Sequence, residues 1–280
     1  MKRLKKLLKT ILSDRQLTMG VVLLLGLLTL LVGAPWISPQ DPYYYGPDVL
    51  AAPGDPNHVL GTNNLGQDIL SMLIYGVRTS LMVAVGAASI SAVVGVLIGG
   101  VAGFFGGKVD AVLSEIINVF MMLPSFFLVL LVVALFGSSI TNVMICIGLT
   151  TWPSNARLMR AQALSLRERT FVQAARAMGE SRPQILFKYI IPNGIFPVVA
   201  NTTLGMAGAI LTEAGLSFLG LGDPNIISWG QMIFAGKTYL TTAWWLSAFA
   251  GVATALTVLT FYLLGDGLNH VLDPKRKGRA

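Results

Sequence analysis

Long stretches without a charged side chain constrain this sequence more than any other feature. A helix needs about 20 mostly apolar residues to cross the hydrocarbon core of a bilayer. The stretch Ile116–Ala156 is long enough for two spans, and Gly137-Ser138-Ser139 inside it predicts a tight turn. We therefore expect an all-α membrane protein with six transmembrane helices. The uncharged stretches are Leu17–Ile37, Thr79–Gly107, Ile116–Ala156, Tyr189–Thr212 and Thr238–Gly265.

The composition excludes an ordinary soluble domain. Only 12% of the residues are charged, against about a quarter in a typical soluble protein. A cleaved signal peptide is the alternative for the first stretch, because a basic segment precedes it. That stretch is longer than a signal-peptide core, however, and it ends in Pro35-Trp36 instead of a small-residue cleavage site. We expect it to be a retained first span.

The basic residues predict the orientation of the chain. Six spans put both termini on one side of the membrane. Of the 20 Lys and Arg residues, all but Arg78 and Lys237 fall in segments on the side of the termini. Because Lys and Arg accumulate on the cytoplasmic side, we expect both termini to be cytoplasmic. The net charge of +7 is then an orientation signal and not a sign of nucleic-acid binding.

The expected spans divide the chain into segments. In the external segment, turns rich in Gly and Pro precede a short helix that Thr62 or Asn63 is expected to cap. The predicted segments are a basic cytoplasmic N-terminus (1–16), the first transmembrane helix (17–37), the external segment (38–77), a domain of five helices with an internal loop at 157–193 (78–267), and a cytoplasmic tail (268–280).

The sequence contains no motif that predicts a catalytic centre. Gly236-Lys237-Thr238 ends like a phosphate-binding loop, but Gln231 occupies the position of the required upstream glycine. No carboxylate pair or His/Cys cluster has the spacing of metal ligands. We therefore expect no cofactor and no metal site. If ATP drives this protein, separate subunits must hydrolyse it.

The internal loop 157–193 has the features of a docking device. Apolar residues recur at helical spacing up to Met178, and Gly179 interrupts the pattern. A second short helix over about 183–189 is expected before Pro192. A helix, a glycine and a second helix on a basic segment together predict a surface for a partner protein.

The same loop carries a resemblance to a known family. Residues 171–179 read Phe-Val-Gln-Ala-Ala-Arg-Ala-Met-Gly, and residues 189–193 read Tyr-Ile-Ile-Pro-Asn. This resembles the EAA loop of type I ABC importer permeases, with Gln173 in place of its Glu. Three further segments resemble the "C"-type permeases of the dipeptide, oligopeptide and nickel importers. They are Gly61–Ser71, Glu213–Gly222 with Ser228-Trp229-Gly230, and Leu264–Leu268 with Leu272-Asp273-Pro274.

The resemblance implies a multi-subunit importer in a prokaryotic plasma membrane. This chain would pair with a homologous "B"-type permease, two ABC ATPase subunits would dock on the cytoplasmic loop, and an extracytoplasmic binding protein would deliver substrate. Di- or oligopeptides are the expected cargo, with nickel or a metallophore as the alternative. Coupling to the ATPase would use Gln173, Ala174, Ala175, Gly179 and Pro192. Ala174 and Ala175 would seat in a groove of the partner, and Gly179 would form a left-handed turn.

The translocation pathway is harder to predict. Asn201 and Thr202 are polar residues inside the fifth span, and Glu213 lies at its outer end. Such groups line pathways in some proteins and join helices in others. Glu213 is expected to meet a peptide amine or the partner permease. An ion-coupled secondary transporter is the alternative from another class, but four of the six expected spans lack the ionisable groups that would bind its coupling ion.

Overall fold

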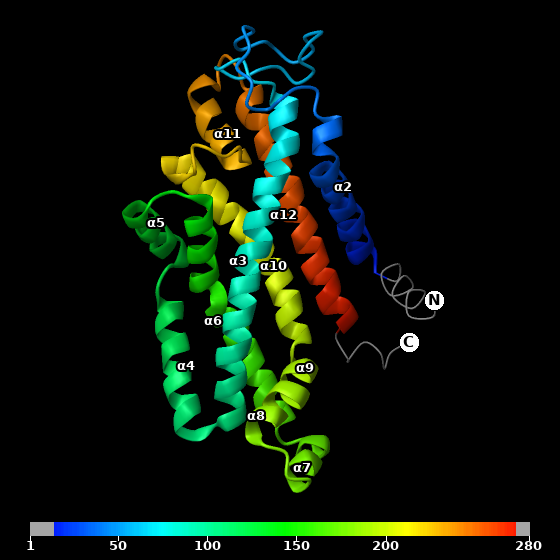
Figure 1. Cartoon of the computed structure of the whole chain (residues 1–280), viewed down its shortest axis with the longest axis vertical. Coiled ribbons are helices and arrows are strands. Elements are labelled where there is room, and N and C mark those ends of the chain that lie inside the picture. Colours follow the sequence, from blue (N-terminus) through cyan, green and yellow to red (C-terminus); the bar gives the residue numbers. More distant parts are fainter. Residues whose placement is uncertain (1–13, 273–280) are drawn as a thin grey trace.

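The computed structural model describes residues 14–272, and these residues form an all-helical bundle (Figure 1). Within this range the backbone pairs as strands only at one isolated bridge, between Thr62 and Asp68. The segment 38–68 lies at one end of the bundle and α7 (Thr170–Ala177) at the other. The remaining main helices are α2 (Arg15–Ile37), α3 (Ile69–Phe105), α4 (Gly107–Met122), α5 (Ser125–Phe136), α6 (Ile140–Leu166), α8 (Arg182–Ile185), α9 (Ile191–Gly194), α10 (Phe196–Leu216), α11 (Trp229–Gly236) and α12 (Trp245–Leu272).

Four of the described helices are long and apolar enough to cross a membrane, namely α2, α3, α10 with its π-helical extension, and α12. The pair α4 and α5 is a fifth if the bent pair is counted as one span. The predicted fourth span corresponds to α6, whose C-terminal half contains Arg157 and Arg160 and is therefore less apolar. The all-helical membrane fold is confirmed, and the count of six spans stays a prediction.

Helix α3 begins where Asp68 caps it. The Asp68 carboxylate accepts the backbone N–H of Ser71 at 2.8 Å, which satisfies one of the free N–H groups of the first turn. Because α3 contains no proline, it runs without a break from Ile69 through the expected second span. The predicted separate short helix capped by Thr62 or Asn63 is therefore wrong, because its residues are the first turns of α3.

The predicted third span is bent. Helices α4 and α5 meet at an angle of 80°, and Leu123 and Pro124 at the break have extended backbone. Proline lacks the N–H that would continue the helix, and it disfavours helical backbone in the residue before it. The expected turn after this span is confirmed, since Gly137 has a φ of +95° and Ser139 caps α6.

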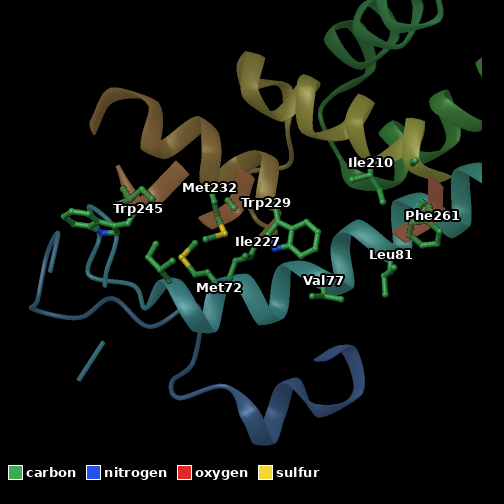
Figure 2. Packing of buried hydrophobic residues seen from close by; sticks show 14 of the residues in the cluster. Met72, Val77, Leu81, Ile210, Ile227, Trp229, Met232, Trp245 and Phe261 are labelled. Carbon is green, nitrogen blue, oxygen red and sulfur yellow. The ribbon is translucent and has the colours of Figure 1, made fainter. Parts of the chain in front are cut away.

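The main hydrophobic cluster runs along the bundle and joins α2, α3, α10, α11 and α12, and Figure 2 shows the part around α3. Trp229 of α11 fills its centre and donates its indole N–H to the carbonyl of Leu73 at 3.1 Å. Gly76 makes this approach possible, because a Cβ there would lie 2.7 Å from the indole nitrogen. The short helix α11 is thereby fixed against the first turns of α3.

The two described ends of the chain lie together. The imidazole Nδ1 of His270, near the end of α12, is 3.3 Å from the Asp14 carboxylate, which caps α2. In Figure 1 these ends of α2 and α12 point toward the half of the bundle that carries α7. An even number of spans requires this arrangement, although the cytoplasmic assignment itself stays a prediction.

Candidate functional sites

The most prominent candidate site is the helix α7 together with the turn that ends it. The backbone N–H of Gly179 donates to the carbonyl of Arg176 at 3.0 Å, and that of Glu180 donates to the carbonyl of Ala175 at 3.1 Å. These two bonds form a Schellman motif, which requires a left-handed residue after the helix. Gly179 supplies it with a φ of +84°. The predicted left-handed turn at Gly179 is confirmed.

The two alanines of the EAA-like segment point in different directions. Ala175 is completely buried, as is Val172, and both pack in a hydrophobic cluster with Phe104 and Ile185. Ala174 is exposed. The expectation that Ala175 also seats in a groove of a partner is wrong, because its methyl group already packs in the chain's own core.

The outward side of α7 presents an apolar stripe instead. Phe171 is 40% exposed and Met178 is 73% exposed, and Ala174 lies between them on the same face because positions i, i+3 and i+7 of a helix align. We call Phe171, Ala174 and Met178 the α7 stripe. Gln173 is also exposed, and its side-chain amide donates to the carbonyl of Glu168 at 3.2 Å. A small apolar surface with a rigid backbone beneath it therefore faces away from the bundle.

The segment after α7 is fixed by a polar cluster. The Glu180 carboxylate accepts the Tyr189 hydroxyl at 2.7 Å and the Lys188 ammonium at 3.1 Å. Because these bonds favour the ionised form, the pKa of Glu180 is lowered, first by Tyr189 and then by Lys188. The same contacts raise the pKa of Lys188, with Glu180 as the main cause. The loop after Gly179 is thus tied to the following helical segment.

The predicted second short helix corresponds to two short elements. Helix α8 begins with a capping box between Ser181 and Gln184 and continues into a π-helical turn over Leu186–Ile190. Pro192 lies at the start of α9, directly after the π-helical turn, and the helical backbone continues from that turn into α9. Because proline has no backbone N–H, it cannot donate to a carbonyl of the preceding turn. These elements lead into α10, so the loop is a series of helical segments.

The predicted pathway residues lie at a polar contact between helices. The Asn201 side-chain amide of α10 donates to the Asn155 Oδ1 of α6 at 2.9 Å, and the Thr202 hydroxyl approaches the same oxygen at 3.4 Å. Asn155 Nδ2 in turn donates to the Ser91 hydroxyl of α3 at 3.1 Å. Sequence reasoning missed Asn155, because its 41-residue stretch was judged by the absence of charge. The amide itself, inside a stretch without charged residues, was the available signal.

Glu213 lies inside the chain. It is 4% exposed and accepts the Ser217 hydroxyl at 2.8 Å, where α10 passes into the π-helical turn over Ser217–Leu221. Helix α11 packs closely against this turn, since a Cβ at Gly230 would lie 2.6 Å from the Cβ of Ser217. The predicted contact of Glu213 with a peptide amine or a partner subunit therefore requires this junction to open.

A cavity of about 240 Å³ lies between the segment 38–68 and α11. Its lining contains no Lys, Arg, Asp, Glu or His. Among the described residues, no group of three or more His, Cys, Asp or Glu side chains could hold a metal ion. The polar members of the lining are Tyr43, Tyr45, Asn63, Asn64, Gln67, Asn225, Ser228 and Gln231.

Comparisons with known proteins agree with this architecture. Residues 95–278 match the family model described as "Binding-protein-dependent transport system inner membrane component". The di/tripeptide transport system permease protein DppC of Pseudomonas aeruginosa is 35% identical over 93% of this chain and 88% of its own length. The dipeptide transport system permease protein DppC of Bacillus subtilis is 36% identical over 91% of this chain and 81% of its own length.

One solved structure supports the fold alone. A chain of the MetNI methionine ABC transporter, in an inward-facing crystal form, superimposes with a TM-score of 0.58. It covers 73% of this chain and 98% of its own length, at 20% sequence identity. The expected type I importer fold is therefore confirmed.

Proposed function

Because this chain belongs to the family of binding-protein-dependent transport system inner membrane components, we propose that it is the permease subunit through which an ATP-driven importer takes up di- or oligopeptides. The relatives named above carry peptide names and match almost the whole chain. The permease would form half of the translocation pathway. A homologous permease would form the other half, and an extracytoplasmic binding protein would deliver the peptide.

The α7 stripe is the observation that carries this proposal. Phe171 and Met178 expose neighbouring apolar surface on one face of α7 at the end of the bundle, and contiguous exposed apolar surface is a mark of protein interaction sites. Val172 and Ala175 anchor the other side of the same helix in the core. A partner that grips α7 would therefore move the bundle along with it. We assign that partner as one of two ABC ATPase subunits, which hydrolyse ATP on behalf of this chain.

The same proposal fixes the sides of the membrane. With α7 in the cytoplasm, the ends of α2 and α12 are cytoplasmic as well. The segment 38–68 and the cavity beside α11 then face the binding protein. This orientation agrees with the distribution of the Lys and Arg residues.

The test is uptake by the complete transporter in proteoliposomes, with radiolabelled dialanine as the probe. We expect accumulation that requires ATP, the ATPase subunits and the binding protein, and that persists when ion gradients are collapsed. Uptake driven by a proton or sodium gradient without ATP would contradict the proposal. ATP-driven uptake of a nickel chelate in place of dialanine would retain the importer and overturn the peptide cargo.

A further inference from the structure

Asn155 connects three helices from a buried position. Its side chain belongs to a residue only 2% exposed on α6. The amide nitrogen reaches Ser91 on α3, and the amide oxygen accepts hydrogen bonds from Asn201 and Thr202 on α10. A buried polar group that loses such partners destabilises the structure. The three helices are therefore held in one particular arrangement at this point.

The two sides of this joint are packed differently. On the α3 side, glycines bring the backbones of α3 and α6 together along several turns. A Cβ at Gly95 would lie 2.5 Å from the Cβ of Asn155, and a Cβ at Gly99 would lie 2.8 Å from the carbonyl carbon of Ala156. Gly103 meets the carbonyl of Arg160 in the same way. Interiors packed this closely resist compression and transmit strain. We therefore expect α3 and α6 to move together, and we call this pair the α3–α6 body.

On the α10 side, the helices around Asn155 are packed less closely than α3 and α6 are. A cavity of about 30 Å³ separates the helices beside Asn155, with Thr151, Ser154 and Thr202 in its lining. Gly205 of α10 also lines this cavity, and a Cβ added there would meet no heavy atom of a neighbouring element within 4 Å. Beside this cavity α10 reaches α6 through the hydrogen bonds of Asn155. On either side of it along the helix, Val198 and Ala209 of α10 pack in hydrophobic clusters with residues of α3.

Asn155 also lies on one of the two routes from α7 to α10, the route that runs through α6. Helix α6 ends at Leu166, and α7 begins four residues later at Thr170. At a rise of 1.5 Å per residue, Asn155 is about 17 Å from that end of α6. Helix α10 continues from Asn201 to the enclosed Glu213 and to α11 at the opposite end of the bundle. A displacement of α7 that moves α6 therefore acts on α10 through the amide of Asn155, in addition to the path along the chain through α8 and α9.

We propose that Asn155 is a positioning residue that couples the α3–α6 body to α10, so that movement of α7 during ATP hydrolysis opens and closes the peptide pathway. This inference rests on the proposed function above. It goes beyond it by naming the element that transmits the movement. Asn201 and Thr202 then act as the receiving side of this joint.

The test is the number of ATP molecules hydrolysed per dialanine taken up by the complete transporter in proteoliposomes. Asn155→Leu keeps the approximate size of the side chain and removes all its hydrogen bonds. We expect basal ATP hydrolysis near the wild-type rate and at least a tenfold rise in ATP consumed per peptide. Thr150→Val is the matched control, because within residues 14–272 the Thr150 side chain bonds only to the carbonyl of Ile147 in its own helix. It should leave the ratio unchanged.

A covalent tie distinguishes coupling from a merely structural role. The Asn155→Leu protein also carries Cys146→Ala, which removes its native thiol. Ser154→Cys and Asn201→Cys then introduce two thiols at positions where the native side-chain polar atoms are 3.4 Å apart. Bridging them with a short thiol-reactive cross-linker should restore the wild-type ratio, and cleaving the cross-linker should abolish it again.

Three results with the Asn155→Leu protein would overturn the inference. They are an unchanged number of ATP molecules per dialanine, a parallel fall of uptake and hydrolysis, and a bridged protein whose ATP consumption per dialanine stays high. If the Asn155→Leu protein does not assemble, the cysteine pair is tested in a protein that keeps Asn155. The inference then expects that bridging the two thiols leaves transport intact. Loss of transport on bridging would show that α6 and α10 have to separate. A wild-type protein without ATP-driven uptake would instead refute the proposed function.

Discussion

Met178 of the α7 stripe offers the most quantitative test of the docking surface. Its side chain is 73% exposed in this chain. Burying a whole methionine side chain contributes about 1.5–3 kcal/mol, so covering the exposed part contributes about 1–2 kcal/mol. Met178→Ala removes most of this contribution without changing the buried side of α7. We therefore expect the ATPase subunits to bind roughly 5- to 30-fold more weakly.

The assay is equilibrium binding of the purified ATPase subunit to the permease complex in lipid nanodiscs. Met122→Ala is the control, because Met122 is 79% exposed but lies at the bend between α4 and α5. It should bind the ATPase with wild-type affinity. The reasoning is refuted if Met178→Ala also binds normally, or if both variants weaken binding equally.

Three further predictions concern stability. Gly179→Ala places a side chain at a φ of +84°, which costs about 1–2 kcal/mol, and hydrogen exchange should show faster opening of α7. Gly99→Ala drives a methyl group into the carbonyl of Ala156 and should lower the melting temperature, at a cost of about 1–3 kcal/mol, whereas Gly208→Ala in open space should not. The contacts of Glu180 stabilise the 180–189 segment fully at pH values above the ordinary Glu pKa, and this stability is lost as the pH falls through the lowered pKa of Glu180. Limited proteolysis at a series of pH values should show the loss, and the Glu180→Gln protein should show no such dependence on pH.

Each of these stability predictions has a result that would contradict it. Unchanged exchange in Gly179→Ala would mean that the left-handed turn does not hold α7. Equal melting temperatures for Gly99→Ala and Gly208→Ala would mean that the seam between α3 and α6 is not close-packed. Proteolysis of the 180–189 segment that does not respond to acid would show that the Glu180 cluster contributes nothing to its order.

Features set by local chemistry could be predicted from the sequence. The uncharged stretches predicted helices, and Gly137 and Gly179 predicted turns, because glycine is the residue that adopts a positive φ most readily. The structure confirms both glycine turns. The apolar periodicity around Ala174 also located α7, which begins three residues before Gln173, the first residue predicted to couple the chain to the ATPase.

Features set by the packing of distant segments could not be predicted in this way. Whether Ala174 or Ala175 faces a partner depends on Phe104 and Ile185, which lie in other helices. The bend at Pro124 was available from the sequence, but a search for uncharged stretches does not register proline. The role of Asn155 emerges only when Ser91 and Asn201 are brought to the same level of the bundle.

The central claim is that ATP hydrolysis acts on this chain through α7, and cross-linking tests it most directly. In a protein with Cys146→Ala, Met178→Cys provides a single thiol on the α7 stripe among the residues of this chain. A short heterobifunctional reagent on this thiol should join the chain to an ATPase subunit in the assembled transporter, and the same reagent on a Phe127→Cys protein should not. An assembled, transporting complex in which residue 178 never joins an ATPase subunit would contradict the account.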